Sequence, residues 1–125
     1  MSPQLEAQLH AHPSEFYADL VYFECGDGWA SLLGGLADKI SALKKSGRLK
    51  RRIRATQAKE KYGALSVYFY PSSAQIDKLV EQTRTAALSV CEHCGKEGKQ
   101  RSIGGWLSTL CDSDYDAWLK KVQRT

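Results

Sequence analysis

The sequence predicts an α+β domain in which helices flank a small antiparallel β-hairpin or sheet, followed by a zinc-ribbon-like knuckle at the C-terminus. Three observations predict this fold. Apolar residues recur at helical spacing between Trp29 and Leu43, apolar residues alternate between Ala64 and Tyr70, and metal-ligand side chains cluster between Cys91 and Asp114. The chain has 125 residues, 42% of them hydrophobic, with ten glycines and three prolines, which is the composition of a single globular domain.

The domain is expected to have three parts. Residues 1–13 are predicted to be mobile, 14–90 to form a helix–hairpin–helix core, and 91–125 to form the knuckle and a terminal helix. No apolar stretch is long enough to cross a membrane, and the acidic first 24 residues lack the charged start and apolar centre of a signal peptide. We therefore expect a cytoplasmic protein with no membrane partner.

The N-terminal half of the core is predicted to contain two helices. Ser14–Phe23 suits a short helix that docks an apolar face. Gly28–Ser46 suits a longer amphipathic helix, whose first turn Asp27 is placed to cap and which Gly47 is placed to end. The apolar residues of this longer helix are Trp29, Leu32, Leu33, Leu36, Ile40 and Leu43.

Two strands and another helix complete the core. Residues 53–59 and 64–70 are predicted to be strands joined by a turn over Glu60–Gly63. Pro71 ends the second strand, and Ser72 or Ser73 then caps a helix that leads into Cys91. The aromatic residues Trp29 and Phe69 lie in core register.

Charge is distributed unevenly along the chain. Residues 1–43 carry one lysine against six acids, whereas 44–61 carry nine lysines and arginines against one acid, within a net charge of +4. This basic band consists of Lys44, Lys45, Arg48, Lys50, Arg51, Arg52, Arg54, Lys59 and Lys61. It is either a solvated face or a surface that binds nucleic acid or an acidic protein. Only Tyr62 lies near it in the sequence, so no aromatic platform for stacking bases is predicted.

The metal-ligand spacing is Cys91-x2-Cys94-x16-Cys111-x2-Asp114, which fits a four-ligand zinc ribbon with aspartate in the last place. Asp114 matches the ligand register, and His93 and Cys25 are the alternatives for the fourth ligand. Thiolates grouped in this way favour metal binding over disulfide formation. A closed set of four ligands favours a structural Zn²⁺ ion over a catalytic one.

Enzyme chemistry has weaker support in the sequence. A divalent-metal nuclease would need carboxylates such as Glu24 or Asp27 to meet Lys59 and Glu60 on the hairpin, and their spacing is loose. We therefore expect a non-enzymatic binding protein, with partner contacts made by the basic band from Arg48 onward. Trp106, on a glycine-rich hairpin, is predicted either to cover the zinc site or to anchor a partner.

Four motifs occur in the order in which a known family carries them. They are Phe23–Trp29 (FECGDGW), Ala55–Gly63 (ATQAKEKYG), Cys91–Gly95 (CEHCG) and Gly105–Cys111 (GWLSTLC). The chain resembles, over about residues 20–115, a family of small proteins encoded by bacteriophages and bacterial prophages. The family pattern has histidine where this chain has Asp114.

The resemblance implies a phage source, a bacterial host cell and a metal site rather than a particular activity. Small accessory phage proteins often act on the host by occupying a surface, for instance on a defence nuclease. The expected partner is therefore a host protein or nucleoprotein complex, with direct nucleic-acid binding as the alternative.

Overall fold

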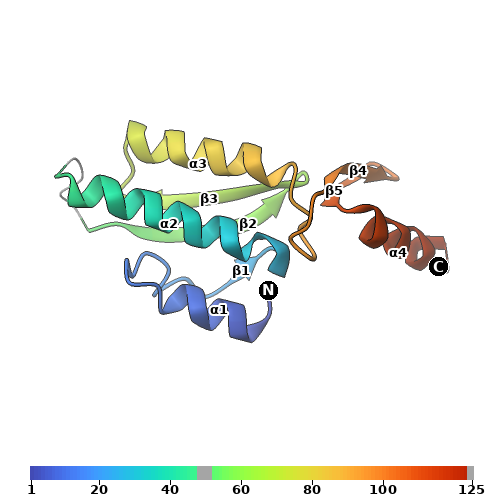
Figure 1. Ribbon diagram of the computed structural model, residues 1–125, viewed down its shortest axis with the longest axis horizontal. Helices are drawn as coiled ribbons and strands as arrows, with labels where there is room; N and C mark the ends of the chain where they lie inside the picture. Colours follow the sequence, from blue (N-terminus) through green and yellow to red (C-terminus); the bar gives the residue numbers. More distant parts are fainter. Residues whose placement is uncertain (48–51, 124–125) are drawn as a thin grey trace.

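The computed structural model describes residues 1–47 and 52–123 and has an α+β fold (Figure 1). Three helices and a three-stranded sheet contribute to the core, and a second, two-stranded sheet with a C-terminal helix forms the knuckle. The elements are α1 (Pro3–His10), β1 (Phe23–Glu24), the 3-10 helix η1 (Asp27–Trp29), α2 (Ala30–Lys45), β2 (Arg54–Lys61), β3 (Ala64–Tyr70), α3 (Ala74–Ala87), β4 (Lys99–Ile103), β5 (Trp106–Leu110) and α4 (Asp112–Gln123).

The larger sheet has the order β1-β2-β3. β2 and β3 form the predicted antiparallel hairpin, and the two-residue strand β1 adds to β2 in parallel. The β2–β3 turn consists of Tyr62 and Gly63 alone, both at positive φ (53° and 82°), because β2 continues two residues further than predicted, to Lys61. Two consecutive residues at positive φ form a type I′ turn, whose backbone twist matches that of the flanking strands. The Glu60 carboxylate accepts a hydrogen bond from the Gly63 N–H at 2.6 Å.

The hydrophobic core lies between this sheet and α2 and α3, which run side by side across one of its faces (Figure 1). Trp29 is fully buried and Phe69 is 8% exposed, which confirms both as core residues. The Tyr17 hydroxyl is also buried and donates to the Leu33 carbonyl at 2.7 Å. The opposite face of the sheet carries no helix among the residues that the structure describes.

The N-terminal segment differs from the prediction. Ser14–Phe23 is not a helix but a series of turns, with Glu15 at a φ of 63°. The helix forms instead over Pro3–His10, within the segment that we expected to be mobile. Ser2 caps this helix by accepting from the Leu5 N–H, and its Leu9 side chain is 6% exposed.

Helix boundaries agree with the sequence more closely elsewhere. Ser73 caps α3 by accepting from the Ile76 N–H at 3.2 Å, and Gly47, at a φ of 81°, follows the end of α2. The predicted cap at Asp27 is wrong. Asp27 lies within η1, and its carboxylate accepts from the Ser2 backbone N–H at 2.6 Å.

The knuckle lies at one end of the molecule, beyond the β2–β3 turn (Figure 1). β4 and β5 form its antiparallel hairpin, turned by Gly104 and Gly105, both at positive φ. α4 follows directly and buries none of its residues fully. In residues 1–47 and 52–123, no helix is long and apolar enough to cross a membrane.

Candidate metal centre

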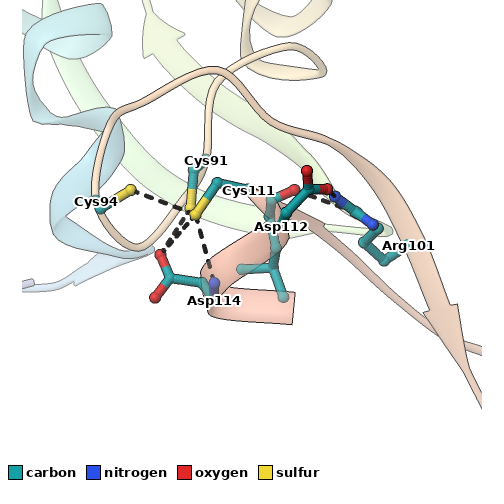
Figure 2. Close-up of polar contacts among 7 residues, drawn as sticks. Cys91, Cys94, Arg101, Cys111, Asp112 and Asp114 are labelled. Carbon is teal, nitrogen blue, oxygen red and sulfur yellow. Dashed lines mark hydrogen bonds and ion pairs between the residues drawn. The ribbon is translucent and has the colours of Figure 1, made fainter. Parts of the chain in front are cut away.

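The structure brings together the four predicted ligands Cys91, Cys94, Cys111 and Asp114 (Figure 2). Their ligand atoms all lie within 4.8 Å of one another. The Asp114 Oδ2 lies 3.2 Å from the Sγ atoms of both Cys91 and Cys111, and the Sγ atoms of Cys94 and Cys111 are 3.7 Å apart. In tetrahedral zinc sites, neighbouring ligand atoms are separated by about 3.3–3.8 Å, as zinc–ligand bonds of about 2.0–2.3 Å require. The cluster therefore fits a four-coordinate metal ion.

Two local backbone structures position these ligands. Cys91 and Cys94 belong to a tight turn in which the Gly95 N–H donates to the Cys91 carbonyl at 2.9 Å. Gly95 leaves the turn at a φ of 81°, a conformation that glycine adopts at little cost. Cys111 directly precedes α4, and the Asp114 N–H points at its Sγ from 3.4 Å. The start of a helix carries partial positive charge, which favours a thiolate and a carboxylate there.

The surroundings of Asp114 keep it in the form that binds a cation. Hydrogen bonds from the Cys91 and Cys111 thiols lower the pKa of its carboxyl group below the ordinary value. The carboxylate is therefore ionised at neutral pH. It supplies one oxygen to a site whose other three ligand atoms are sulfur.

Neither alternative fourth ligand joins the cluster. Among the residues that the structure describes, the group of close metal-ligating side chains contains Asp114 but not His93 or Cys25. Cys25 is a buried core residue, and burial together with the charge of Glu92 raises the pKa of its thiol to about 12. This thiol packs as a small apolar group.

The cysteine turn is held against the core by the Cys25–Trp29 segment. The Gly28 N–H donates to the Glu92 carbonyl at 2.7 Å, and the Gly26 N–H donates to the Glu92 carboxylate at 3.0 Å. The indole N–H of Trp29 donates to the Val90 carbonyl at 2.8 Å. A Cβ atom at Gly28 would collide with the Cys91 carbonyl oxygen and would lie 2.6 Å from the Gly95 nitrogen. Only glycine allows this approach.

The β2–β3 turn holds the other side of the knuckle. The buried Thr109 hydroxyl donates to the Gly63 carbonyl at 2.5 Å, and the Gln100 side chain donates to the Tyr62 carbonyl at 3.0 Å. The Thr109 carbonyl in turn accepts from the Glu92 N–H at 2.9 Å, which joins β5 to the cysteine turn. All four motifs therefore meet where the knuckle joins the core. The sequence gives no sign of this convergence, because the contacts between the core and the knuckle join residues 38 to 66 positions apart.

An ion pair orients the start of α4. The Arg101 guanidinium lies 2.6 Å from the Asp112 carboxylate (Figure 2). It also lies 4.5 Å from the centre of the Tyr115 ring. The hydrogen bond and the charge of Arg101 lower the pKa of the Asp112 carboxyl group. Arg101 thus links β4 to the helix that carries Asp114.

A groove of about 460 Å³ runs beside the cluster, lined by residues that include Glu92, His93, Trp106, Asp114 and Trp118. Trp106 is 69% exposed in its wall, so it does not bury the cluster. Of the two predicted roles for Trp106, the open position fits a partner anchor better than a cover for the metal site.

The predicted partner-binding residues that the structure describes lie just before β2, along β2 and at the start of β5. Arg48, Lys50 and Arg51 lie outside the described residues. Arg52 and Arg54 lie at the start of β2, Lys59 and Lys61 lie towards its end, and all except the half-buried Lys59 are exposed. β5, which begins at Trp106, lies at the opposite end of the molecule from the start of β2 (Figure 1).

The basic band has aromatic neighbours in space besides Tyr62, the one that lies near it in the sequence. Strand pairing places Arg54 opposite Tyr70 and Gln57 opposite Tyr68. The Arg54 guanidinium lies 5.7 Å from the centre of the Tyr70 ring. Tyr68 and Tyr70 follow Arg54 by 14 and 16 residues in the sequence, so only the strand register shows that they lie near it.

The carboxylates considered for nuclease chemistry make separate hydrogen bonds in different parts of the structure. Asp27 accepts from the Ser2 N–H, and Glu60 accepts from the Gly63 N–H within the β2–β3 turn. Glu24 and Lys59 are neighbours in adjacent strands. Among the described residues these carboxylates do not form a group that would hold a metal ion.

Comparisons with known proteins do not identify the chain. None of the protein-family models matches it, and neither a curated protein nor a solved structure matches it with significance.

Proposed function

We propose that the chain is a non-enzymatic binding protein, stabilised by a structural Zn²⁺ ion, that acts on a host protein or nucleoprotein in the cytoplasm of a bacterial cell. The cluster of three cysteines and Asp114 supports the proposed metal site. The resemblance to phage and prophage proteins supports the source, and a host defence complex is the class of target that it suggests. The basic band supports an acidic or nucleic-acid-containing partner.

The donor set favours zinc. Three thiolates are soft ligands that select zinc over magnesium or calcium, and a set of four protein ligands leaves no open position for a substrate on a four-coordinate ion. All four cysteines are free, as zinc binding in a reducing cytoplasm requires.

The knuckle needs such an ion because it has almost no core of its own. Over residues 91–123, only Cys91, Thr109 and Leu110 are buried, whereas the core cluster gathers its residues from Leu9 to Ala87. A segment that buries so little apolar surface is stabilised by a metal in many small folds.

Asp114 is the position where this chain departs from the family pattern. Asp114→Ala is expected to weaken zinc binding by about 100-fold or more, because losing even an outer partner of a ligand costs 10–100-fold. Asp114→His is expected to restore binding to at least the wild-type level, since imidazole is a good zinc ligand. Competition with a chromophoric chelator measures both affinities. Equal affinity in the wild type and the alanine variant would remove Asp114 from the site.

The binding role is tested by affinity capture from bacterial lysate, with and without nuclease treatment. We expect a dominant partner that is lost when Arg48, Arg51, Arg52 and Arg54 are all replaced by glutamate. The matched control is Lys120→Glu with Lys121→Glu, exposed positions on α4 at the other end of the molecule. Both variants should melt at the wild-type temperature. Capture that survives the arginine replacements would contradict the assignment of the basic band.

A further inference from the structure

Among the residues that the structure describes, no helix covers the face of the β1-β2-β3 sheet that points away from α2 and α3, and we call it the open face. Along β3 the residues alternate, with Val67 and Phe69 buried towards the helices and Tyr68 and Tyr70 on the other side. Tyr68 is 46% exposed and Tyr70 is 63% exposed. Two neighbouring aromatic side chains therefore stand on a solvent-facing sheet surface.

The strand register places cationic and polar side chains beside these rings. Arg54 is the partner of Tyr70, Gln57 of Tyr68, and Lys59 of Ser66. Arg54 already contacts the Tyr70 ring, at 5.7 Å from its centre. The open face thus alternates aromatic rings with groups that attract phosphate.

Positive charge continues beyond both ends of this face. Arg52 is exposed just before β2, Lys44 and Lys45 end α2 nearby, and Lys61 ends β2 (Figure 1). The eight residues of β2 span about 23 Å at the usual rise of a strand. This length is enough for several nucleotides of an extended strand.

We propose that this open face binds single-stranded nucleic acid, with bases stacked on Tyr68 and Tyr70 and the phosphate backbone held by Arg52, Arg54 and Lys59. The inference rests on the proposed function, because it names the partner of the same basic band. Aromatic rings that alternate with basic side chains are the usual means of holding unstacked bases. Duplex bases are stacked on each other, so a duplex cannot use the rings.

The composition of the face favours nucleic acid over a protein partner. Its β2 and β3 side chains are aromatic, basic or polar, with no large aliphatic residue among those that the register places there. Acidic groups lie at the β1 edge, where Glu24 is exposed and pairs with Lys59. The phosphate path is therefore expected over β2 and β3, and Glu24→Gln should leave affinity unchanged or raise it.

The test measures fluorescence anisotropy of labelled 12-nucleotide single strands, one DNA and one RNA of the same sequence, and of the corresponding DNA duplex. We expect the duplex to bind at least about tenfold more weakly than the single strands. Tyr68→Ala and Tyr70→Ala should each weaken single-strand binding by about fivefold or more, which is the smallest effect of losing one stacked base. Comparison of the DNA and RNA strands shows whether the sugar, deoxyribose or ribose, changes the affinity.

Two control variants separate the loss of base stacking from a loss of folding and from nonspecific binding. The double variant Tyr68→Phe with Tyr70→Phe keeps both rings and should bind like the wild type. Lys120→Gln removes an exposed positive charge on α4, outside this face, and should also bind like the wild type. Arg54→Gln reports on the same face without changing a tyrosine. It should reduce the dependence of affinity on salt, because one phosphate contact is lost.

Three results would overturn the inference: no binding to either single strand, equal affinity for duplex and single strand, or full affinity in Tyr68→Ala and Tyr70→Ala. The proposed function fails separately. A protein captured from nuclease-treated lysate and lost in the arginine-to-glutamate variant would uphold the proposed function while excluding nucleic acid as the partner.

Discussion

Replacing Cys111 with serine is expected to abolish zinc binding and to unfold the knuckle. The substitution removes one of three thiolates and leaves the other two and Asp114 without a complete coordination sphere. Apparent binding energies of structural zinc sites are about 10–16 kcal/mol, and this energy is available for folding only while the ligand set is intact. We expect zinc content to fall from one ion per chain to none and the melting temperature to fall by about 10 °C or more.

The matched control is Cys25→Ala. Cys25 is a buried cysteine outside the cluster, so this variant should keep its zinc and lose only a modest amount of packing energy. Zinc retained in Cys111→Ser, or lost in Cys25→Ala, would contradict the ligand assignment.

Amide hydrogen exchange should localise the effect of Cys111→Ser. The core has its own apolar cluster on α2 and the larger sheet, whereas residues 91–123 bury only three side chains fully. Loss of zinc is therefore expected to remove protection from β4 and β5 first and to leave α2 protected. Uniform loss of protection in α2 and β5 would show instead that the core and the knuckle unfold together.

Gly28→Ala is expected to have the second-largest effect. The added methyl group would collide with the backbone carbonyl of Cys91, and both atoms belong to segments fixed by hydrogen bonds. Because no flexible side chain can move aside, we expect a loss of about 3 kcal/mol, at the upper end of overpacking costs, and weaker zinc binding. Chemical denaturation and zinc titration measure the two effects.

Gly34→Ala is the matched control for this prediction. Gly34 lies inside α2, and a Cβ atom there would meet no other atom within 4 Å. Alanine favours a helix over glycine by about 1 kcal/mol, so this variant should gain stability. If Gly28→Ala were as stable as Gly34→Ala, the close approach of the CGDGW segment to the cysteine turn would be contradicted.

The sequence predicted the elements whose patterns are local and regular. Helical spacing located α2, strict alternation located β3, and ligand spacing located the metal cluster, including Asp114. The signals for α2 and β3 come from neighbouring residues within a single element. The signal for the metal cluster comes from two i, i+3 pairs of ligand side chains.

The N-terminal segment shows where local pattern fails. Phe16, Tyr17 and Leu20 are buried as predicted, but turns rather than a helix carry them to the core. The same apolar spacing suits both arrangements. α1 was missed because it places only Leu9 fully in the core, so its sequence has little periodicity.

Contacts between distant segments were beyond prediction. β1 has only two residues and pairs in parallel with β2, which no alternation pattern reveals. The glycines of the CGDGW motif act through Glu92 and Cys91, more than 60 residues away. The tyrosines beside Arg54 depend likewise on strand register.

X-ray absorption at the zinc edge of the purified protein tests the central claim most directly. The account predicts one zinc ion per chain, with three sulfur ligands at about 2.3 Å and one oxygen ligand at about 2.0 Å. A protein purified without zinc, or zinc bound with fewer than three sulfur neighbours, would contradict it.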